Sequence, residues 1–374
     1  MKCTYFQNSF CQTCDLLDRS YDQGVQLKNE ELQKLFPNQV NCIKESSVLN
    51  LGQAHSRSKA KFAVFSIDNL VHFGFYNSIG TPKILENCPL HSEGINDLLP
   101  QLKELLESCK IIPYDLKTKK GEIKYLLISK SENEFLVRFV LRSKESLDRL
   151  KTGARKFTAL YPEVAVITAN IQPIHQAIIE GEEELILTNK KVIEHCFDEF
   201  KLTLGARSFF QVTPAMAKKL YNALSEEVKA DRPKSLIDLY CGVGAFSFYA
   251  SRWCDQVVGV EISKEAIDCA LGANLINHKQ IAFYAMDVDD YLKSTDQKFE
   301  AVLVNPPRRG LNTSIINQIK LIDPKFIYYS SCNAITMQRD FEELKDNYNI
   351  RSLQLFDMFP FTQHFETLMC LVRK

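Results

Sequence analysis

A cysteine and a carboxylate near the end of the chain have the types and spacing needed for covalent chemistry. Cys332 follows an expected strand over residues 326–331 and directly precedes an expected helix over 334–345. A cysteine at such a junction can have a lowered pKa, because the helix N-terminus and nearby arginines stabilise its thiolate. Glu366 lies at the start of the last expected strand, where its carboxylate would be a candidate general base.

These two groups would suit methylation at C5 of a pyrimidine. A thiolate at Cys332 would attack the electron-poor C6, which turns C5 into an enolate-like carbanion able to take a sulfonium methyl group. Glu366 would then remove the C5 proton, so that elimination frees the enzyme. Taken alone, a strand-end cysteine is more often an inert core residue, and a lone glutamate is more often a solvated charge. The interpretation therefore depends on the elements around them.

Those elements alternate between strand and helix in the second half of the chain. Strands are expected over 235–240, 256–262, 281–286, 301–305 and 326–331, and the last two, over 350–356 and 367–372, have no helix between them. This pattern predicts an α/β fold with a doubly wound, largely parallel sheet and an antiparallel hairpin at one edge. Ligands of such folds bind beyond the carboxyl ends of the strands, which is where Cys332 would lie.

A turn with two glycines follows the first of these strands. Gly242 and Gly244 would let the backbone approach a ligand closely. Glu261 ends the next strand, where a carboxylate can accept both ribose hydroxyl protons, and Asp287 ends the third, near an expected adenine. The third glycine of a dinucleotide fingerprint is missing. S-adenosylmethionine is therefore favoured over a nicotinamide cofactor, with a turn that binds no ligand as the remaining alternative.

Together these motifs resemble the class I methyltransferases and, more specifically, the RNA uracil-C5 methyltransferase family. The resemblance covers essentially the whole chain and is most specific in the segments 208–214, 305–310, 330–333 and 364–367. It implies a Rossmann-like methyltransferase domain that uses S-adenosylmethionine. It also implies that Cys332 is the nucleophile, that Glu366 is the base, and that the cofactor is contacted by Gln211, Tyr240, Glu261 and Asn305.

One departure from the family pattern leaves alternatives open. Many members have Asp-Pro-Pro-Arg where this chain has Asn305-Pro306-Pro307-Arg308, a change typical of one branch. Asn-Pro-Pro also occurs in amino-group methyltransferases, but there an aromatic residue usually stands where Arg308 does. The branch it resembles most acts on 23S ribosomal RNA, the expected partner, with tRNA or another 23S site as alternatives. A non-catalytic RNA-binding protein with a metal cluster is the hypothesis from a different class.

Four further cysteines have the chemistry of a metal site. Four thiolates can hold zinc or an iron–sulfur cluster, and the candidates are Cys3, Cys11, Cys14 and Cys88. Pro89 after the last of them favours iron–sulfur mildly, while Cys42 and Cys109 are spare cysteines that keep the assignment from being unique. Zinc and unligated thiols remain alternatives from the residues alone. The family resemblance implies a 4Fe-4S cluster on the four positions.

The charge distribution suggests a track for phosphates. Lysine plus arginine and aspartate plus glutamate both number 46, which excludes a uniformly basic nucleic-acid binder but not a local basic face. Basic residues gather in the central region, although a run of this kind is often only a solvated face. The expected RNA contacts are Arg57, Lys59, Lys61, Lys119, Lys120, Lys124, Arg138 and Arg142.

The domain organisation expected from these patterns has three parts. Residues 1–45 form a segment with the cysteine cluster, 46–200 form a central α+β RNA-binding domain that contributes Cys88, and 201–374 form the methyltransferase domain. The beginning of the chain lacks the pattern of a signal peptide, and no apolar run approaches the roughly 18–20 residues that span a bilayer. We therefore expect a cytoplasmic monomer without a membrane partner.

Overall fold

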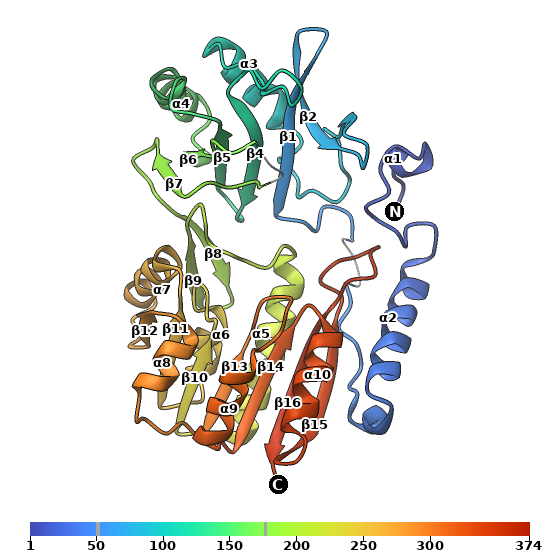
Figure 1. Cartoon of the computed structure of the whole chain (residues 1–374), viewed down its shortest axis with the longest axis vertical. Helices are drawn as coiled ribbons and strands as arrows, with labels where there is room; N and C mark the ends of the chain where they lie inside the picture. Colours follow the sequence, from blue (N-terminus) through green and yellow to red (C-terminus); the bar gives the residue numbers. More distant parts are fainter. Residues whose placement is uncertain (50–52, 176–177) are drawn as a thin grey trace. The chain divides into compact units, whose positions relative to one another are not determined.

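The computed structural model describes residues 1–49, 53–175 and 178–374. The chain forms two compact units (Figure 1). Unit 1 comprises Met1–Gln12, Gly52–Cys196 and Leu204–Ala206, and unit 2 comprises Thr13–Leu51, Phe197–Thr203 and Arg207–Lys374. The segment expected over residues 1–45 is thus divided between the two units.

Unit 1 is built on a seven-stranded sheet with the order β3-β2-β1-β4-β5-β6-β7. Its neighbouring strands are antiparallel except for the parallel pair β5–β6, which α4 connects. The strands are β1 (Lys59–Ile67), β2 (Leu70–Tyr76), β3 (Pro82–Ile84), β4 (Ile123–Lys130), β5 (Phe135–Leu141), β6 (Val164–Ile171) and β7 (Glu183–Ile186). The helices are α1 (Thr4–Gln7), α3 (Leu99–Ser108) and α4 (Leu147–Leu160).

The core of unit 1 lies on one face of this sheet. Alternation along β1 sends Phe62 and Val64 to that face. There they join leucines of α3 and the apolar side of α4, such as Leu102 and Leu150. The opposite face of the sheet therefore carries the intervening residues, Lys61 and Ala63 among them.

Unit 2 is built on a second seven-stranded sheet, with the order β12-β11-β10-β13-β14-β16-β15. The first five strands are parallel, and β16 pairs antiparallel with both β14 and β15. The predicted α/β sheet with an antiparallel hairpin at one edge is confirmed. The strands are β10 (Ser235–Leu239), β11 (Gln256–Glu261), β12 (Ala282–Ala285), β13 (Ala301–Val304), β14 (Phe326–Ser331), β15 (Tyr348–Phe356) and β16 (Glu366–Arg373).

The helices of this unit connect its strands and cover the sheet. They are α2 (Tyr21–Leu35), α5 (Pro214–Asp231), α6 (Ala245–Ala250), α7 (Lys264–Ile276), α8 (Val288–Ser294), α9 (Thr313–Ile322) and α10 (Ala334–Leu344), with a 3₁₀ helix at Pro37–Cys42. Helix α2 begins in a capping box, in which Ser20 and Gln23 satisfy each other's backbone N–H groups. Its Leu32, and Phe36 just beyond it, are buried in the same core as the strands.

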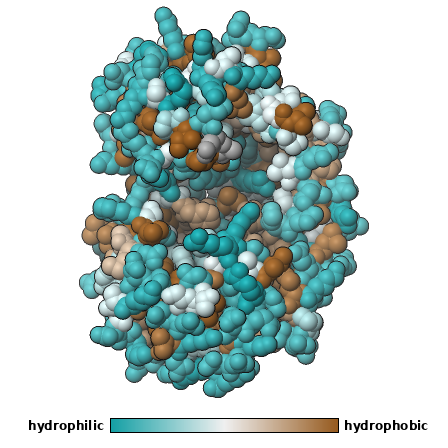
Figure 2. Space-filling view, viewed as in Figure 1, coloured by the Kyte–Doolittle hydropathy of each residue, from teal (hydrophilic) through white to brown (hydrophobic). Residues whose placement is uncertain are grey.

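A two-stranded hairpin of β8 (Ile193–Phe197) and β9 (Phe200–Leu204) spans the boundary between the units along the chain. Within the described residues, no helix is both long and apolar enough to cross a membrane. Hydrophilic side chains predominate on the face drawn in Figure 2, with apolar ones scattered among them.

Candidate active site

The end of β14 holds Cys332 in a fixed turn between strand and helix. The next residue, Asn333, caps α10, and its side-chain oxygen accepts hydrogen bonds from the backbone N–H groups of Ile335 and Thr336 at 3.2 and 3.4 Å. Its side-chain nitrogen donates to the backbone oxygen of Arg308 at 2.9 Å. The helix cap therefore ties the cysteine turn to the loop that follows β13.

Glu366 lies at the beginning of β16, the strand that pairs with β14. The register places Thr367 opposite Ser331, and the hydroxyl of Ser330 donates to Glu366 Oε1 at 2.7 Å. The glutamate is only 2% exposed. Burial raises its pKa to about 7, against the opposing effect of the Ser330 hydrogen bond. The structure thus brings together the two side chains to which the sequence assigned chemistry, and it adds a serine that the sequence analysis gave no role.

The pKa of Cys332 differs from the sequence-based expectation. Burial raises it above its usual value, and the nearby Glu366 raises it further. Hydrogen bonding and charge from Arg308 act in the opposite direction but do not reverse the shift. The prediction of a lowered pKa was therefore wrong, because the desolvation of the thiol outweighs the arginine.

A cavity of about 250 Å³ opens beside the thiol. Besides Cys332 and Arg308 it is lined by His364, Phe365, Ile335 and, from helix α2, Glu31. His364 and Phe365 were visible in the sequence only as neighbours of Glu366. Nothing in the local sequence pointed to Glu31, which reaches this cavity through the packing of a distant helix.

The glycine loop after β10 is held to the end of β11 by Glu261. One carboxylate oxygen of Glu261 accepts from the backbone N–H of Gly242 at 3.3 Å, and the other accepts from Ser263 at 2.9 Å. Gly244, the N-cap residue of α6, has a φ of 82°, and a Cβ built there would lie 2.7 Å from the Phe283 ring. This position favours glycine for both reasons.

Other expected cofactor residues lie at the same ends of the strands. The backbone N–H of Asn305 donates to the carbonyl oxygen of Leu239 at 3.3 Å, which joins the ends of β13 and β10. Burial raises the pKa of Tyr240 to about 12, and Asp287 and Glu261 contribute to the shift, so these side chains share one electrostatic environment. Asp287 also caps α8 by accepting from Asp289 and Asp290. Gln211 is buried, in the segment ahead of α5.

Asp238, in β10 below the glycine loop, is a functional candidate that the sequence analysis did not select. It is fully buried, and burial raises its pKa to about 7. Oδ2 accepts a hydrogen bond from Ser247 at 2.5 Å, whereas Oδ1 has no partner among the described residues. A buried carboxylate oxygen without a hydrogen-bond donor is uncommon in folded proteins, and this singles out Asp238 beside the glycine loop. Its place at the start of the Asp238–Phe246 segment was the signal that could have identified it.

The four expected metal ligands are not assembled as a metal site in the residues that the structure describes. Burial raises the pKa of Cys88, and smaller contributions from Cys11 and Cys3 show that both of these thiols of unit 1 lie within electrostatic reach of Cys88. The fourth, Cys14, belongs to unit 2. No group of three or more His, Cys, Asp or Glu side chains is placed there to hold a metal ion. In the described part of the chain, Cys11 and Cys3 therefore lie near Cys88, but the thiols do not have the geometry of metal ligands.

Two of the expected RNA-binding residues are buried and already bound to other groups of the protein. Arg138 is 1% exposed and forms ion pairs with Glu184 at 2.5 Å and Glu180 at 2.9 Å. Lys124 is buried, and its ammonium donates to Gln172 and to the Ile174 carbonyl oxygen. These two cations are neutralised or satisfied inside unit 1, so a phosphate contact from them does not fit the structure.

The other basic candidates differ in how accessible their charges are. Lys61, Lys119 and Lys120 are exposed. Arg142 is partly exposed and pairs with Glu122 at 2.6 Å. Arg57 and Lys59 are partly buried, and burial lowers the pKa of Lys59.

Comparisons with known proteins agree with this architecture. The model of the tRNA (uracil-5-)-methyltransferase family matches residues 20–374. A 23S rRNA (uracil(747)-C(5))-methyltransferase of Vibrio vulnificus is 36% identical over 100% of both chains. One from Shewanella pealeana is likewise 36% identical over 100% of both chains.

The solved structures support the same fold. The tRNA (uracil-54, C5)-methyltransferase of Pyrococcus abyssi, in complex with S-adenosyl-L-homocysteine, superposes with a TM-score of 0.80 at 24% identity. The match covers 96% of this chain and 85% of that chain. The α/β class I methyltransferase fold expected from the sequence is therefore confirmed. The chain belongs to the tRNA (uracil-5-)-methyltransferase family and is a methyltransferase enzyme.

Proposed function

We propose that this protein transfers a methyl group from S-adenosylmethionine to C5 of a uracil in 23S ribosomal RNA, at the position corresponding to 747. The observation that carries the proposal is the full-length similarity to relatives with this printed activity, together with a cysteine, a buried glutamate and a cavity at one end of the sheet. A neighbour solved with S-adenosyl-L-homocysteine supports the choice of methyl donor.

The nucleophile in this proposal is Cys332. Its raised pKa means that the resting thiol is mostly protonated at neutral pH. The thiolate must therefore form as the target uracil enters the cavity. Arg308 stabilises the thiolate by hydrogen bond and charge. Attack on C6 forms a carbon–sulfur bond and moves the electron pair of the C5–C6 double bond toward C5 and the O4 carbonyl.

Glu366 is the proposed base for the second half of the reaction. S-adenosylmethionine supplies an electrophilic methyl group, which C5 takes. The carboxylate of Glu366 then removes the C5 proton, the double bond re-forms, and the sulfur of Cys332 leaves as the thiolate. A pKa of about 7 suits this task, because a base is most effective when its pKa is near the working pH.

The proposed cofactor residues are the groups at the ends of β10, β11 and β13. Glu261 would bind the ribose hydroxyls, Asp287 would meet the adenine amino group, and Tyr240, Asn305 and Gln211 would complete the pocket. The backbone at Gly242, where an added Cβ would meet nothing within 4 Å, permits close approach of the ligand.

The test is methyl transfer from labelled cofactor to a 23S RNA fragment that contains the target loop, followed by mapping of the modified nucleotide. Cys332→Ala is the control: it should abolish transfer and leave cofactor affinity nearly unchanged, because other strand ends build the cofactor pocket. Methylation of an exocyclic amino group, or substantial activity in Cys332→Ala, would refute the proposal.

We also propose that unit 1, with residues 46–200 as its main part, is the RNA-binding domain and that residues 201–374 are the catalytic domain. Positive charge for phosphates would come from Arg57, Lys59, Lys61, Lys119, Lys120 and Arg142, since Lys124 and Arg138 are committed to internal contacts. Uracil inside a helix hides C5 and C6, so the target base must be flipped out or lie in a loop.

A 4Fe-4S cluster on Cys3, Cys11, Cys14 and Cys88 is the remaining part of the proposal. Four thiolates are the donor set for such a cluster, and the nearness of Cys11 and Cys3 to Cys88, whose pKa they help to raise, supports it. Protein purified without oxygen should be brown and contain about four irons per chain. Cys88→Ser should lose the iron, whereas Cys196→Ser, at an exposed cysteine elsewhere, should keep it. A colourless protein with zinc or no metal would overturn this assignment.

A further inference from the structure

The face of the unit 1 sheet opposite α3 and α4 carries tyrosines. In the register of the sheet, Ala63 of β1 pairs with Gly74 of β2 on one side and with Tyr125 of β4 on the other. Since side chains alternate along a strand, Tyr76, two residues after Gly74, lies on the same face as Tyr125. Lys61, two residues before Ala63, lies there too. Strand alternation therefore puts two half-buried tyrosines and an exposed lysine on the face away from the core.

A shallow aromatic cavity of about 20 Å³ lies beside these tyrosines. It is lined by Tyr76, Tyr114, Leu116, Lys124, Tyr125 and His175. Tyr114 and His175 are joined by a hydrogen bond of 2.9 Å between the phenol oxygen and Nδ1. The cavity is too small to enclose a ligand. A flat ligand could therefore contact the aromatic rings only at the open side of the cavity.

The contacts of Lys124 fix the walls of this cavity. Its ammonium lies 4.8 Å from the centroid of the Tyr114 ring. It also donates at 2.8 Å to the carbonyl oxygens of Gln172 and Ile174, in the segment that leads to His175. One buried cation therefore holds β4, Tyr114 and the segment before His175 together. The aromatic groups are preorganised, which lowers the entropic cost of binding.

A turn with exposed lysines adjoins the cavity. Residues 115–120 form a turn closed by backbone hydrogen bonds between Asp115 and Lys120 and between Lys119 and Asp115. The Asp115 carboxylate accepts from its own turn, at the N–H groups of Lys117 and Thr118. Its charge is thus directed to the backbone, while the side chains of Lys117, Lys119 and Lys120 are exposed.

We infer that Tyr76, Tyr125 and His175 form a stacking site for an unpaired base of the RNA substrate, with the buried Tyr114 holding His175 by its hydrogen bond. The lysines of the 115–120 turn would contact the adjacent phosphates. This inference rests on the proposed function, because it names where the single-stranded part of that RNA binds. An aromatic surface beside exposed cations is the combination that binds single strands, since every base offers a flat π face and every nucleotide carries a phosphate.

The test measures RNA affinity on the full-length protein by fluorescence anisotropy. The probes are a fluorescein-labelled single-stranded RNA of mixed sequence and the same RNA annealed to its complement. Tyr125→Ala and Tyr76→Leu should each weaken binding of the single strand by roughly 5- to 150-fold, the range for loss of one base stack. Tyr125→Phe keeps the ring and should bind within about twofold of the wild type. Duplex binding should not change, because its bases are already stacked.

Two further variants, one control and one test, separate stacking from loss of structure. Leu160→Ala removes an exposed apolar side chain at the end of α4 and should bind both probes like the wild type. His175→Ala changes an exposed residue, so its loss of single-strand affinity cannot arise from an emptied core. Single-strand affinity unchanged in Tyr125→Ala and His175→Ala, or an equal loss on duplex, would overturn the stacking site. A wild-type protein that binds RNA but does not methylate C5 of uracil would refute the proposed function and leave this result standing.

Discussion

Glu366 has to be buried enough to exclude water and still ionise often enough to act as a base. Its pKa of about 7 is the outcome of burial, which raises it, and the Ser330 hydroxyl, which lowers it. The carboxylate form is present above this pKa and is lost as the pH falls through it. We expect turnover to fall about tenfold per pH unit below pH 6, while cofactor binding changes little. A pH profile of the single-turnover release of free methylated RNA from the covalent adduct checks this, and a flat profile between pH 5.5 and 7.5 would contradict it.

Ser330 is a positioning residue whose effect can be separated from simple packing. Ser330→Ala removes a hydrogen bond to a charged group, worth about 1.5–3 kcal/mol, so the pKa of Glu366 should rise by roughly one to two units. The acid limb of the pH profile should shift upward by that amount. Thr367→Val is the matched control, because its buried hydroxyl has no partner among the described residues. If both variants only reduce the rate at every pH, Ser330 has no effect on the base.

Replacing the base should stop the reaction after the methyl transfer. In Glu366→Gln the carbon–sulfur bond to Cys332 forms and C5 is methylated, but the C5 proton stays. We expect a protein–RNA band that survives denaturing electrophoresis, and it should be absent from the double variant Cys332→Ala/Glu366→Gln. Normal turnover in Glu366→Gln without a trapped adduct would assign the base to another residue.

The sequence predicted which residues meet at this site better than it predicted their ionisation. Cys332 and Glu366 were placed by strand order, since the carboxyl end of β14 and the beginning of β16 lie at the same edge of the sheet. The pKa of Cys332 could not be predicted from the sequence, because it depends on how much solvent the surrounding residues remove. The same holds for Arg138, whose partner Glu184 becomes its neighbour only when β5 and β7 flank β6.

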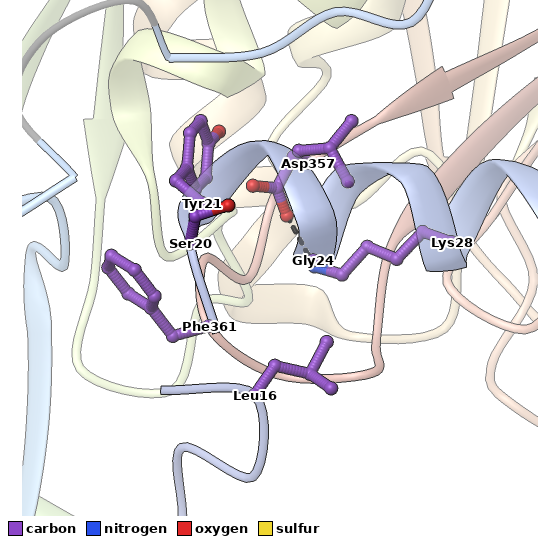
Figure 3. A pocket seen from close by; sticks show the side chains of 8 residues that line it. Leu16, Ser20, Tyr21, Gly24, Lys28, Asp357 and Phe361 are labelled. Atoms are coloured by element: carbon purple, nitrogen blue, oxygen red, sulfur yellow. Dashed lines mark hydrogen bonds and ion pairs between the residues drawn. The ribbon is translucent and has the colours of Figure 1, made fainter. Parts of the chain in front are cut away.

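At the scale of elements, helix α2 and the segment before β16 are joined by a buried ion pair. Lys28 and Asp357 lie 2.5 Å apart, at 2% and 1% side-chain exposure. The Lys28 ammonium also donates to the Phe359 carbonyl oxygen at 3.1 Å. Figure 3 shows Lys28 reaching from the helix to Asp357, with Tyr21 and Phe361 nearby. These contacts fix the start of the segment that leads to His364 and Glu366.

Lys28→Met should therefore destabilise the protein by about 3–5 kcal/mol, because it leaves the Asp357 charge buried without its partner. Urea unfolding of unit 2, followed by the fluorescence of Trp253, measures the change. Lys34→Met on the exposed side of the same helix is the control and should change stability by less than about 0.5 kcal/mol. The double variant Lys28→Met/Asp357→Leu should recover most of the stability that Lys28→Met loses. A loss in the double variant as large as in Lys28→Met would mean that packing, not charge, explains the effect.

The strands of unit 2 were predictable because buried parallel strands are short apolar runs bounded by turn residues. The packing of helix α2 was less predictable, because nothing in the local pattern indicated that it lies in the same core as β15. The ion pair that secures it joins residues 329 positions apart. Contacts of such separation leave no periodic signal in a single sequence.

At the scale of the whole molecule, the net charge of zero leaves the position of the charges to decide RNA binding. Unit 1 has several of its basic residues paired with glutamates, including Arg138, Arg142 and Lys144. The lysines at 117, 119 and 120 are exposed together in one turn. This turn is therefore where we expect the phosphate contacts of unit 1 to be concentrated.

Lys119→Ala combined with Lys120→Ala should weaken RNA binding and flatten its dependence on salt. Each lost phosphate contact removes about 0.7–0.9 from the slope of log affinity against log salt, so the pair should reduce it by roughly 1.4 to 1.8. Affinity for S-adenosylmethionine should not change, since both lysines belong to unit 1 and the glycine loop to unit 2. The choice of target uracil should also persist, because phosphate contacts position the RNA while base contacts select the nucleotide.

Lys264→Ala with Lys345→Ala makes the same change of charge at exposed lysines of unit 2 and should keep the wild-type slope. Equal slopes in both double variants would show that the 115–120 turn is only a solvated surface and that the phosphates are bound elsewhere.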